Sequence, residues 1–247
     1  IGKAPALCDR RRGIGADGIV LVLPSATADF RMRIFNADGS EPEMCGNGIR
    51  CFAKYVKARG LTTHERIRVE TGAGIITPEF DGDLIRVNMG PPILEGERIP
   101  TTKKSSRVIA EPISFGNQTF AVTAVSMGNP HAVIFVDEIT DEQVLGIGPK
   151  LESHPFFPRR TNVEFIKVVN DSELVMRVFE RGVGETMACG TGACASAVAG
   201  LLNGKSGNRV TVHLLGGDLR IEWDGTESHP VYMTGPANAV FEGTVDI

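Results

Sequence analysis

The sequence contains no apolar run approaching the roughly 20 residues that span a bilayer, so we predict no transmembrane helix. It has no excess of basic residues either. The 26 Lys and Arg against 30 Asp and Glu give a net charge of −4, which argues against nucleic acid as a main partner. No two cysteines have the C-x-x-C spacing of a zinc knuckle, and we expect no metal site. Five cysteines, an odd number in 247 residues, exclude a disulfide scaffold and favour a reducing compartment.

Glycine, in contrast, is abundant. The chain has 29 glycines in 247 residues, about 12% against a typical value of about 7%. Without a collagen-like period, this excess predicts many tight turns or places where backbone approaches a ligand closely. Hydrophobic residues at 42% and charged residues at 23% are ordinary globular values. The chain begins with Ile1 rather than Met, so we expect the natural start to precede it.

Most of the sequence predicts short strands. Runs rich in Val, Ile and Phe, bounded by Gly, Pro, Asp or Asn, cover residues 19–23, 30–35, 84–89, 132–136, 163–169 and 174–179. Two segments predict helices instead. Apolar residues recur at i, i+3, i+4 and i+7 from Ile49 to Val56, and the pattern stops at Gly60. Residues 193–202 are small and apolar on nearly all sides, which suits a helix buried all round.

The chain also repeats part of itself. Residues 32–53 align without gaps with residues 176–197, and 8 of the 22 aligned positions are identical. The identical pairs are Met32/Met176, Arg33/Arg177, Phe35/Phe179, Glu41/Glu185, Cys45/Cys189, Gly46/Gly190, Gly48/Gly192 and Ala53/Ala197. Each copy reads as strand, polar turn, Cys-Gly-x-Gly and helix. We infer a duplicated domain, with an N-terminal domain 1–92 and a C-terminal domain 93–236.

The duplicated cysteines suggest a chemistry. A helix N-terminus carries unpaired N–H groups and partial positive charge, so we expect a lowered thiol pKa for Cys45 and Cys189. The neighbouring glycines would let a carboxylate lie against these N–H groups. An internal two-fold would place the two thiols on opposite sides of one cleft. A thiolate on one face and a thiol on the other could then invert the α-carbon of an amino acid.

Other cysteine and glycine patterns give weaker evidence of a function. Residues 13–18 match G-x-G-x-x-G, but a charged segment precedes them and a strand follows, the reverse of a dinucleotide fingerprint. Residues 190–195 fit the looser G-x-G-x-x-A pattern without the acidic residue expected about 20 positions later. Cys51 and Cys194 lie inside the predicted helices, and we interpret them as core. Cys8 receives no role.

Several motifs together resemble the diaminopimelate epimerase family over essentially the whole chain. The first active-site block matches Asn-Ala-Asp-Gly-Ser-Glu at 36–41 and Met-Cys-Gly-Asn-Gly at 44–48. The second matches Glu-Arg-Gly at 180–182 and Ala-Cys-Gly-Thr-Gly at 188–192. Further similar segments are 11–17, 128–131, 160–163 and 233–236.

The resemblance implies a cofactor-independent epimerase that interconverts L,L- and meso-diaminopimelate in lysine biosynthesis by two-base proton transfer. It implies that Cys45 and Cys189 are the catalytic acid/bases. His131 and Glu180 would orient the substrate and help to deprotonate the thiols. The remaining substrate contacts implied are Gly46, Asn47, Gly190 and Thr191 around the reacting carboxylate, Asn36, Asn162 and Arg181 at the distal carboxylate, and Asn129 near the centre.

The fold expected on this basis is α+β. It has two pseudo-symmetric domains, each a curved, largely antiparallel sheet wrapped around a central helix, 46–59 or 190–203. The resemblance also implies that a first strand precedes this chain and that a C-terminal strand within 237–247 returns to the first domain. We hypothesise that the domains close on substrate, because a lower dielectric in the cleft would strengthen the electrostatics. We further expect a homodimer in the cytoplasm, or in the plastid stroma of a plant or alga.

Three alternative functions stay open from the sequence. The nearest is another two-thiol racemase, acting on proline or hydroxyproline. The Arg181, Asn162 and Asn36 set argues instead for a substrate with a second polar end. A cysteine hydrolase with a Cys–His pair would need only one thiol. A non-catalytic binding module of the same fold would exchange no α-proton.

Overall fold

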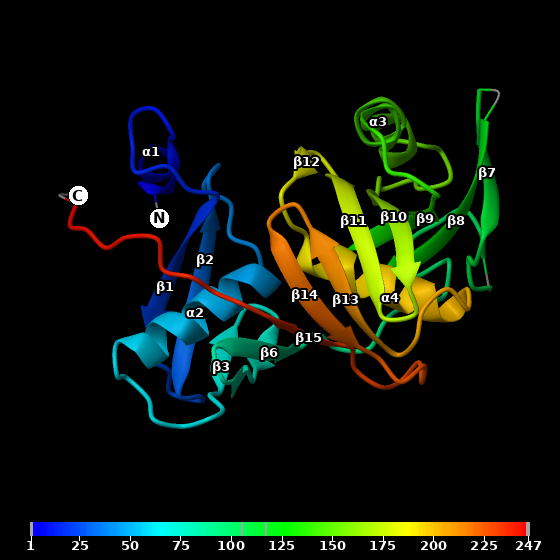
Figure 1. The fold of residues 1–247 in the computed structure, drawn as a ribbon. Helices are drawn as coiled ribbons and strands as arrows, with labels where there is room; N and C mark the ends of the chain where they lie inside the picture. Colours follow the sequence, from blue (N-terminus) through cyan, green and yellow to red (C-terminus); the bar gives the residue numbers. More distant parts are fainter. Residues whose placement is uncertain (1, 105, 117, 246–247) are drawn as a thin grey trace. The chain divides into compact units, whose positions relative to one another are not determined.

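The computed structural model describes residues 2–104, 106–116 and 118–245. The chain divides into two compact units, drawn from blue to red along the sequence in Figure 1. Unit 1 comprises Ile1–Asn88 and Gly235–Ile247, and unit 2 comprises Met89–Thr234.

Unit 1 ends its first segment at Asn88, four residues before residue 92, the expected end of the N-terminal domain. The segment that follows Asn88 is hydrogen-bonded within unit 2. Met89 N donates to the carbonyl of Val231 at 2.9 Å, and Ile93 exchanges two backbone hydrogen bonds of 2.9 Å with Ser126. The pair Pro91-Pro92 therefore lies inside unit 2 and is not a linker.

The described residues of unit 1 form a four-stranded sheet, a β-hairpin and two helices. Its elements are α1 (Ala4–Cys8), β1 (Gly18–Leu23), β2 (Phe30–Asn36), α2 (Gly46–Ala58), β3 (Val69–Thr71), β4 (Gly74–Ile76), β5 (Glu79–Asp81) and β6 (Leu84–Asn88). The strand order is β1-β2-β3-β4, and only β2 and β3 pair in parallel. A hairpin joins β5 to β6. Helix α2 packs against β1, β2 and β6 (Figure 1).

The periodicity of residues 49–56 correctly predicts the buried face of α2. Ile49, Phe52 and Val56 are all 1% exposed or less. Phe52 also meets Phe30 of β2 edge to face, with ring centroids 6.2 Å apart. The helix ends at Ala58, and Gly60 follows in the left-handed conformation (φ 65°) that favours glycine after a helix.

Unit 2 contains a longer curved sheet. Its elements are β7 (Glu111–Phe115), β8 (Gln118–Ser126), β9 (Pro130–Phe135), the π-helix η1 (Glu142–Ile147), α3 (Gly148–Glu152), β10 (Asn162–Asn170), β11 (Glu173–Glu180), β12 (Gly184–Thr186), α4 (Gly190–Leu202), β13 (Arg209–Leu214), β14 (Gly217–Glu222) and β15 (Tyr232–Gly235). The strand order is β15-β14-β13-β11-β10-β9-β8-β7, with β12 also paired to β11. Pairing is antiparallel except for β9 with β10 and β11 with β13.

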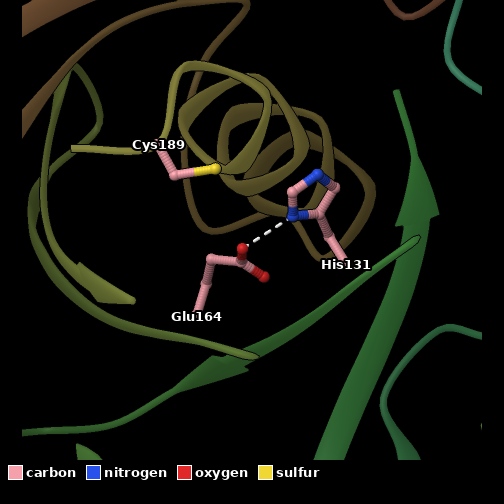
Figure 2. Close-up of side chains that lie close together, drawn as sticks. All are labelled: His131, Glu164 and Cys189. Atoms are coloured by element: carbon pink, nitrogen blue, oxygen red, sulfur yellow. Dashed lines mark hydrogen bonds and ion pairs between the residues drawn. The ribbon is translucent and has the colours of Figure 1, made fainter. Parts of the chain in front are cut away.

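Helix α4 lies against this sheet and touches six of its strands, from β8 and β9 through to β13 and β14 (Figure 1). As predicted for a helix that is apolar all round, residues 192–200 are all buried. The opposite face of β9 and β10 packs under η1 and α3, where Val163 and Phe165 belong to an apolar cluster. Because side chains alternate along a strand, Glu164 points the other way, toward α4 (Figure 2).

The expected C-terminal strand within 237–247 is wrong for the described residues. Residues 236–245 form no strand, and residues 246–247 lie outside the described range. Pro236 has no N–H to donate to a ladder. Val240 and Phe241 are 89% and 70% exposed, so no neighbouring strand buries them. The segment does group with unit 1, where Glu242 pairs with Arg59 at 3.2 Å.

None of the helices formed by the described residues combines the length and the apolarity needed to cross a bilayer.

Candidate active site

Both predicted cysteines are helix N-caps, one in each unit. Cys45 precedes α2 and accepts a hydrogen bond from Gly48 N at 3.4 Å. Cys189 precedes α4 and accepts one from Gly192 N at 3.3 Å. Both caps have extended backbone, and both helices are 13 residues long. The strand, turn, Cys-Gly-x-Gly and helix predicted from the repeat are thus the same local structure built twice.

An arginine–glutamate pair braces the turn before each cysteine. Arg33 on β2 donates to both carboxylate oxygens of Glu41 at 2.8 Å. Arg177 on β11 donates to both oxygens of Glu185 at 2.7 and 3.2 Å. All four residues are identical pairs of the internal repeat. In each unit the two hydrogen bonds hold the strand against the turn that leads into the helix. This shared role explains why the arginine and the glutamate are identical in both copies of the repeat.

Cys189 belongs to a polar network within unit 2 whose members are buried or half-buried. Its Sγ is 3.4 Å from Thr191 Oγ1, and Thr191 Oγ1 accepts from Asn129 Nδ2 at 3.2 Å. Asn129 Oδ1 is 3.1 Å from His131 Nε2, and His131 Nδ1 is 2.6 Å from Glu164 Oε1. Four of these five residues were expected at the site from the sequence, and the structure connects them through side chains.

Glu164 has no place in the sequence-based prediction. It is fully buried on β10, with both its side chain and that of His131 at 0% exposure. Its signal in the sequence is weak: one charged residue inside the otherwise apolar run Val163–Ile166. A buried strand carries such a residue only when its charge is paired or neutralised. The partner, His131, is 33 positions away, so the pairing could not be read from local pattern.

The lowered pKa expected for Cys189 is wrong. Burial raises the pKa of this thiol well above its ordinary value, and the nearby carboxyl groups of Glu180 and Glu164 raise it further. Hydrogen bonds from Thr191 and Gly192 act in the opposite direction but are smaller. Cys189 is therefore a neutral thiol at physiological pH, suited to donate a proton.

We expect this pKa shift to be visible in alkylation. The thiolate is the reactive form, so the alkylation rate of Cys189 should still be rising above pH 9, whereas free cysteine levels off near its pKa of about 8.5. Mass spectrometry of the Cys189 peptide, with free cysteine as the reference, measures both profiles. A plateau for Cys189 below pH 8 would contradict the assignment.

His131, Glu164 and Cys189 also form a donor set of the kind that binds zinc, because their ligand atoms lie within 4.8 Å of one another. Figure 2 shows the three side chains converging. However, two ligands at 2.0–2.1 Å from a tetrahedral zinc stand about 3.3 Å apart. Nδ1 of His131 and Oε1 of Glu164 are only 2.6 Å apart, which is a hydrogen-bond distance. In this arrangement the imidazole of His131 and the carboxyl group of Glu164 share a proton.

The remaining predicted residues of unit 2 border this network. Glu180 lies at the end of β11 and accepts a hydrogen bond from Thr186 Oγ1. Asn162 is buried; its Nδ2 donates to the carbonyl of Pro130 at 2.9 Å, and its Oδ1 accepts from Arg181 N at 2.9 Å. The exposed Arg181 side chain donates to the carbonyl of Arg159 at 3.3 Å. Asn162 thus shapes the loop that presents Arg181.

The other predicted residues of unit 1 lie on β2 and α2. Asn36 ends β2, and its Nδ2 donates to Ser40 Oγ at 2.9 Å. Asn47, in the first turn of α2, accepts from Arg50 Nη2 at 3.0 Å. Cys45 is half-buried.

Cys51, which we interpreted as core, is exposed on α2, because it falls on the face opposite Ile49 and Phe52. Cys194 is buried, as expected.

Comparison with known proteins agrees with these features. The family model described as diaminopimelate epimerase matches residues 2–95 and 123–240. The diaminopimelate epimerase of Moorella thermoacetica is 60% identical over 247 residues, covering 98% of this chain and 88% of the relative. That of Pelotomaculum thermopropionicum is 58% identical, with the same coverage of both chains.

Solved structures show the same fold at low identity. A hydroxyproline epimerase from Agrobacterium vitis has a TM-score of 0.66 at 15% identity, covering 95% of this chain and 77% of that one. A PhzF-family phenazine biosynthesis protein from Bacillus anthracis has a TM-score of 0.63 at 16% identity, covering 90% and 82%. The α+β fold with largely antiparallel sheets was thus predicted correctly. With the family model matching most of the sequence and relatives above 50% identity, the chain belongs to the diaminopimelate epimerase family.

Proposed function

We propose that the chain interconverts L,L- and meso-diaminopimelate by passing protons through the thiols of Cys45 and Cys189. The epimerase activity, in lysine biosynthesis, is that of the family to which the chain belongs. The observation that carries the two-thiol assignment is the duplicated turn, in which each cysteine caps a 13-residue helix. One thiolate removes the α-proton, and the other thiol delivers a proton to the opposite face.

The helix N-termini supply the electrostatic part of the proposal. Removing the α-proton puts negative charge onto the substrate carboxylate. The N–H groups in the first turn of a helix have no intrahelical partner and carry partial positive charge. We assign the backbone of Gly46, Asn47, Gly190 and Thr191 to this carboxylate. Pre-organised donors of this kind stabilise the transition state because they need no reorientation as the charge develops.

The other predicted residues divide into two groups in this proposal. His131 and Glu180 exchange protons with the thiols and orient the substrate. The raised pKa of Cys189 supports a role for a nearby base. In the reverse reaction Cys189 must remove the α-proton, so its neutral thiol must first lose its own proton. Asn36, Asn129, Asn162 and Arg181 bind the rest of the substrate. An arginine suits a distal carboxylate because its guanidinium can donate two parallel hydrogen bonds.

Deuterium incorporation tests the function directly. In D₂O, we expect the enzyme to convert L,L-diaminopimelate to the meso form with one deuteron at the inverted α-carbon, read by mass spectrometry and NMR. Proline and hydroxyproline should show no exchange. Exchange on proline alone would assign the chain to the racemase alternative, and a complete absence of exchange on all three would leave a binding module.

We also propose that the chain acts as a homodimer in the cytoplasm. The dimer is supported by the family resemblance. The compartment is supported by the five cysteines, none of which forms a disulfide, since secreted domains of this size commonly pair theirs.

A further inference from the structure

The buried carboxyl group of Glu164 is the feature of unit 2 that the proposed function leaves unexplained. Oε1 faces His131 Nδ1 at 2.6 Å, whereas Oε2 has no hydrogen-bond partner among the described residues. A charged carboxylate with an unpartnered oxygen in an apolar interior is strongly disfavoured. Burial accordingly raises the pKa of Glu164, and the opposing effect of His131 is smaller. These conditions favour a state in which Glu164 and His131 together are neutral.

The hydrogen-bond partners of His131 fix how many protons that state holds. Asn129 donates through Nδ2 to Thr191, which leaves its Oδ1 to accept from His131 Nε2 at 3.1 Å. Nε2 therefore carries a proton. A further proton must lie between Nδ1 and Oε1, because two acceptors 2.6 Å apart would repel each other. The pair thus holds two protons and has no net charge.

The surroundings hold the carboxyl group in this position. A Cβ on Gly192 would lie 2.8 Å from Glu164 Oε1, so only glycine at this helix position leaves room for the carboxyl group. The titratable groups that face it are His131 from β9, Cys189 from the N-cap of α4, and Glu180 from the end of β11. Figure 2 shows the carboxyl group of Glu164 below the thiol and the imidazole ring, with the three side chains pointing toward one another.

We propose that Glu164 is a positioning residue for His131: it shares one proton with Nδ1, and so fixes Nε2 as the ring nitrogen that exchanges protons in the reaction. When Nε2 gives up its proton, the shared proton settles on Nδ1 and Glu164 becomes the carboxylate. When Nε2 takes a proton back, the pair returns to neutral. No charge is left on an unpaired imidazolium in the buried site at any stage. This inference rests on the proposed function of His131 as an acid/base.

The substitution Glu164→Gln keeps the shape and one hydrogen bond but cannot share the proton. We expect kcat to fall about 10- to 100-fold, the loss found when a metal-binding histidine is deprived of its carboxylate partner. The pH profile of kcat should also move. In the native pair, losing a proton creates a buried negative charge, which raises the apparent pKa. In Glu164→Gln, losing a proton removes a buried positive charge, which lowers it. The acidic limb should therefore shift to lower pH, and Glu164→Asp, which retains a carboxyl group, should restore part of the native profile.

Proton NMR of the native enzyme provides a readout that is independent of activity. The shared proton should appear as a far-downfield imidazole resonance, assigned to His131 by its loss in His131→Gln, and absent from Glu164→Gln. A native enzyme that epimerises diaminopimelate but lacks this resonance overturns the inference, whether or not Glu164→Gln folds. So does a folded Glu164→Gln with native kcat and pH profile. A native enzyme that does not epimerise diaminopimelate refutes the proposed function instead.

Discussion

Replacing either Cys45 or Cys189 with serine is expected to lower the rate of diaminopimelate epimerisation by about 10²- to 10⁴-fold, the usual contribution of a general acid or base. A serine hydroxyl is far less acidic than a thiol, so it neither removes nor readily delivers the α-proton. The rate of interconversion, measured by separating the stereoisomers, checks this expectation.

Exchange without inversion should distinguish the two variants. An intact thiolate can still remove the α-proton from the face it serves and return a deuteron to the same face. We therefore expect each variant to exchange the α-proton of one stereoisomer only, with retention, and Cys45→Ser and Cys189→Ser to have opposite preferences. A cysteine hydrolase that relies on one thiol would instead leave Cys189→Ser fully active.

Cys51→Ser is the matched control for this experiment. Cys51 lies on α2, about 1.7 turns after the N-cap Cys45, but its exposed side chain has no role in the proposed reaction. It should retain native activity. Circular dichroism of all three variants shows whether they fold alike. A folded Cys45→Ser or Cys189→Ser that inverts the substrate at the native rate would show that the thiols are not the acid/base pair.

Substituting Gly192 with alanine is expected to lower kcat by about 10²-fold, the effect of misplacing a catalytic group by about 1 Å. The new Cβ would lie 2.8 Å from Glu164 Oε1 and 3.2 Å from Cys189 Sγ. Glu164 cannot move aside freely, because its hydrogen bond to His131 is buried. The thiol must therefore rotate or the helix must shift. Crowding of this kind in a packed interior also costs about 1–3 kcal/mol of stability, which thermal unfolding measures.

Gly48→Ala provides the comparison at the equivalent position of the repeat. There the added Cβ would lie 2.9 Å from Ile34 Cδ1 and 3.4 Å from Cys45 Cβ. The end of an isoleucine side chain can adjust, so we expect a smaller loss of activity and stability than for Gly192→Ala. Equal losses for the two variants would mean that the contact with Glu164 is no more rigid than the contact with Ile34, contrary to the buried pair described above.

Much of the fold could be predicted from the sequence because it depends on local pattern. The spacing from Ile49 to Val56 defined the buried face of α2, and the small residues after Ala193 defined a helix buried all round. The repeat placed both cysteines at helix N-termini, since the same local sequence folds the same way twice. The expected strand within 237–247 failed for the opposite reason. Whether an extended segment becomes a strand depends on a partner ladder, which no local pattern specifies.

The chemistry of the site could likewise be predicted from the sequence only where it depends on local pattern. The sequence by itself determined the family and the position of the two cysteines at helix N-termini, because both depend on contiguous motifs of a few residues. Only the tertiary structure decided the protonation of the site. A cysteine at a helix N-terminus is expected to have a lowered thiol pKa. At Cys189, burial and the carboxyl groups of Glu180 and Glu164 raise the pKa instead. Desolvation and charge act through space, and the residues responsible come from β10 and β11, strands that pack near α4 only once the chain has folded.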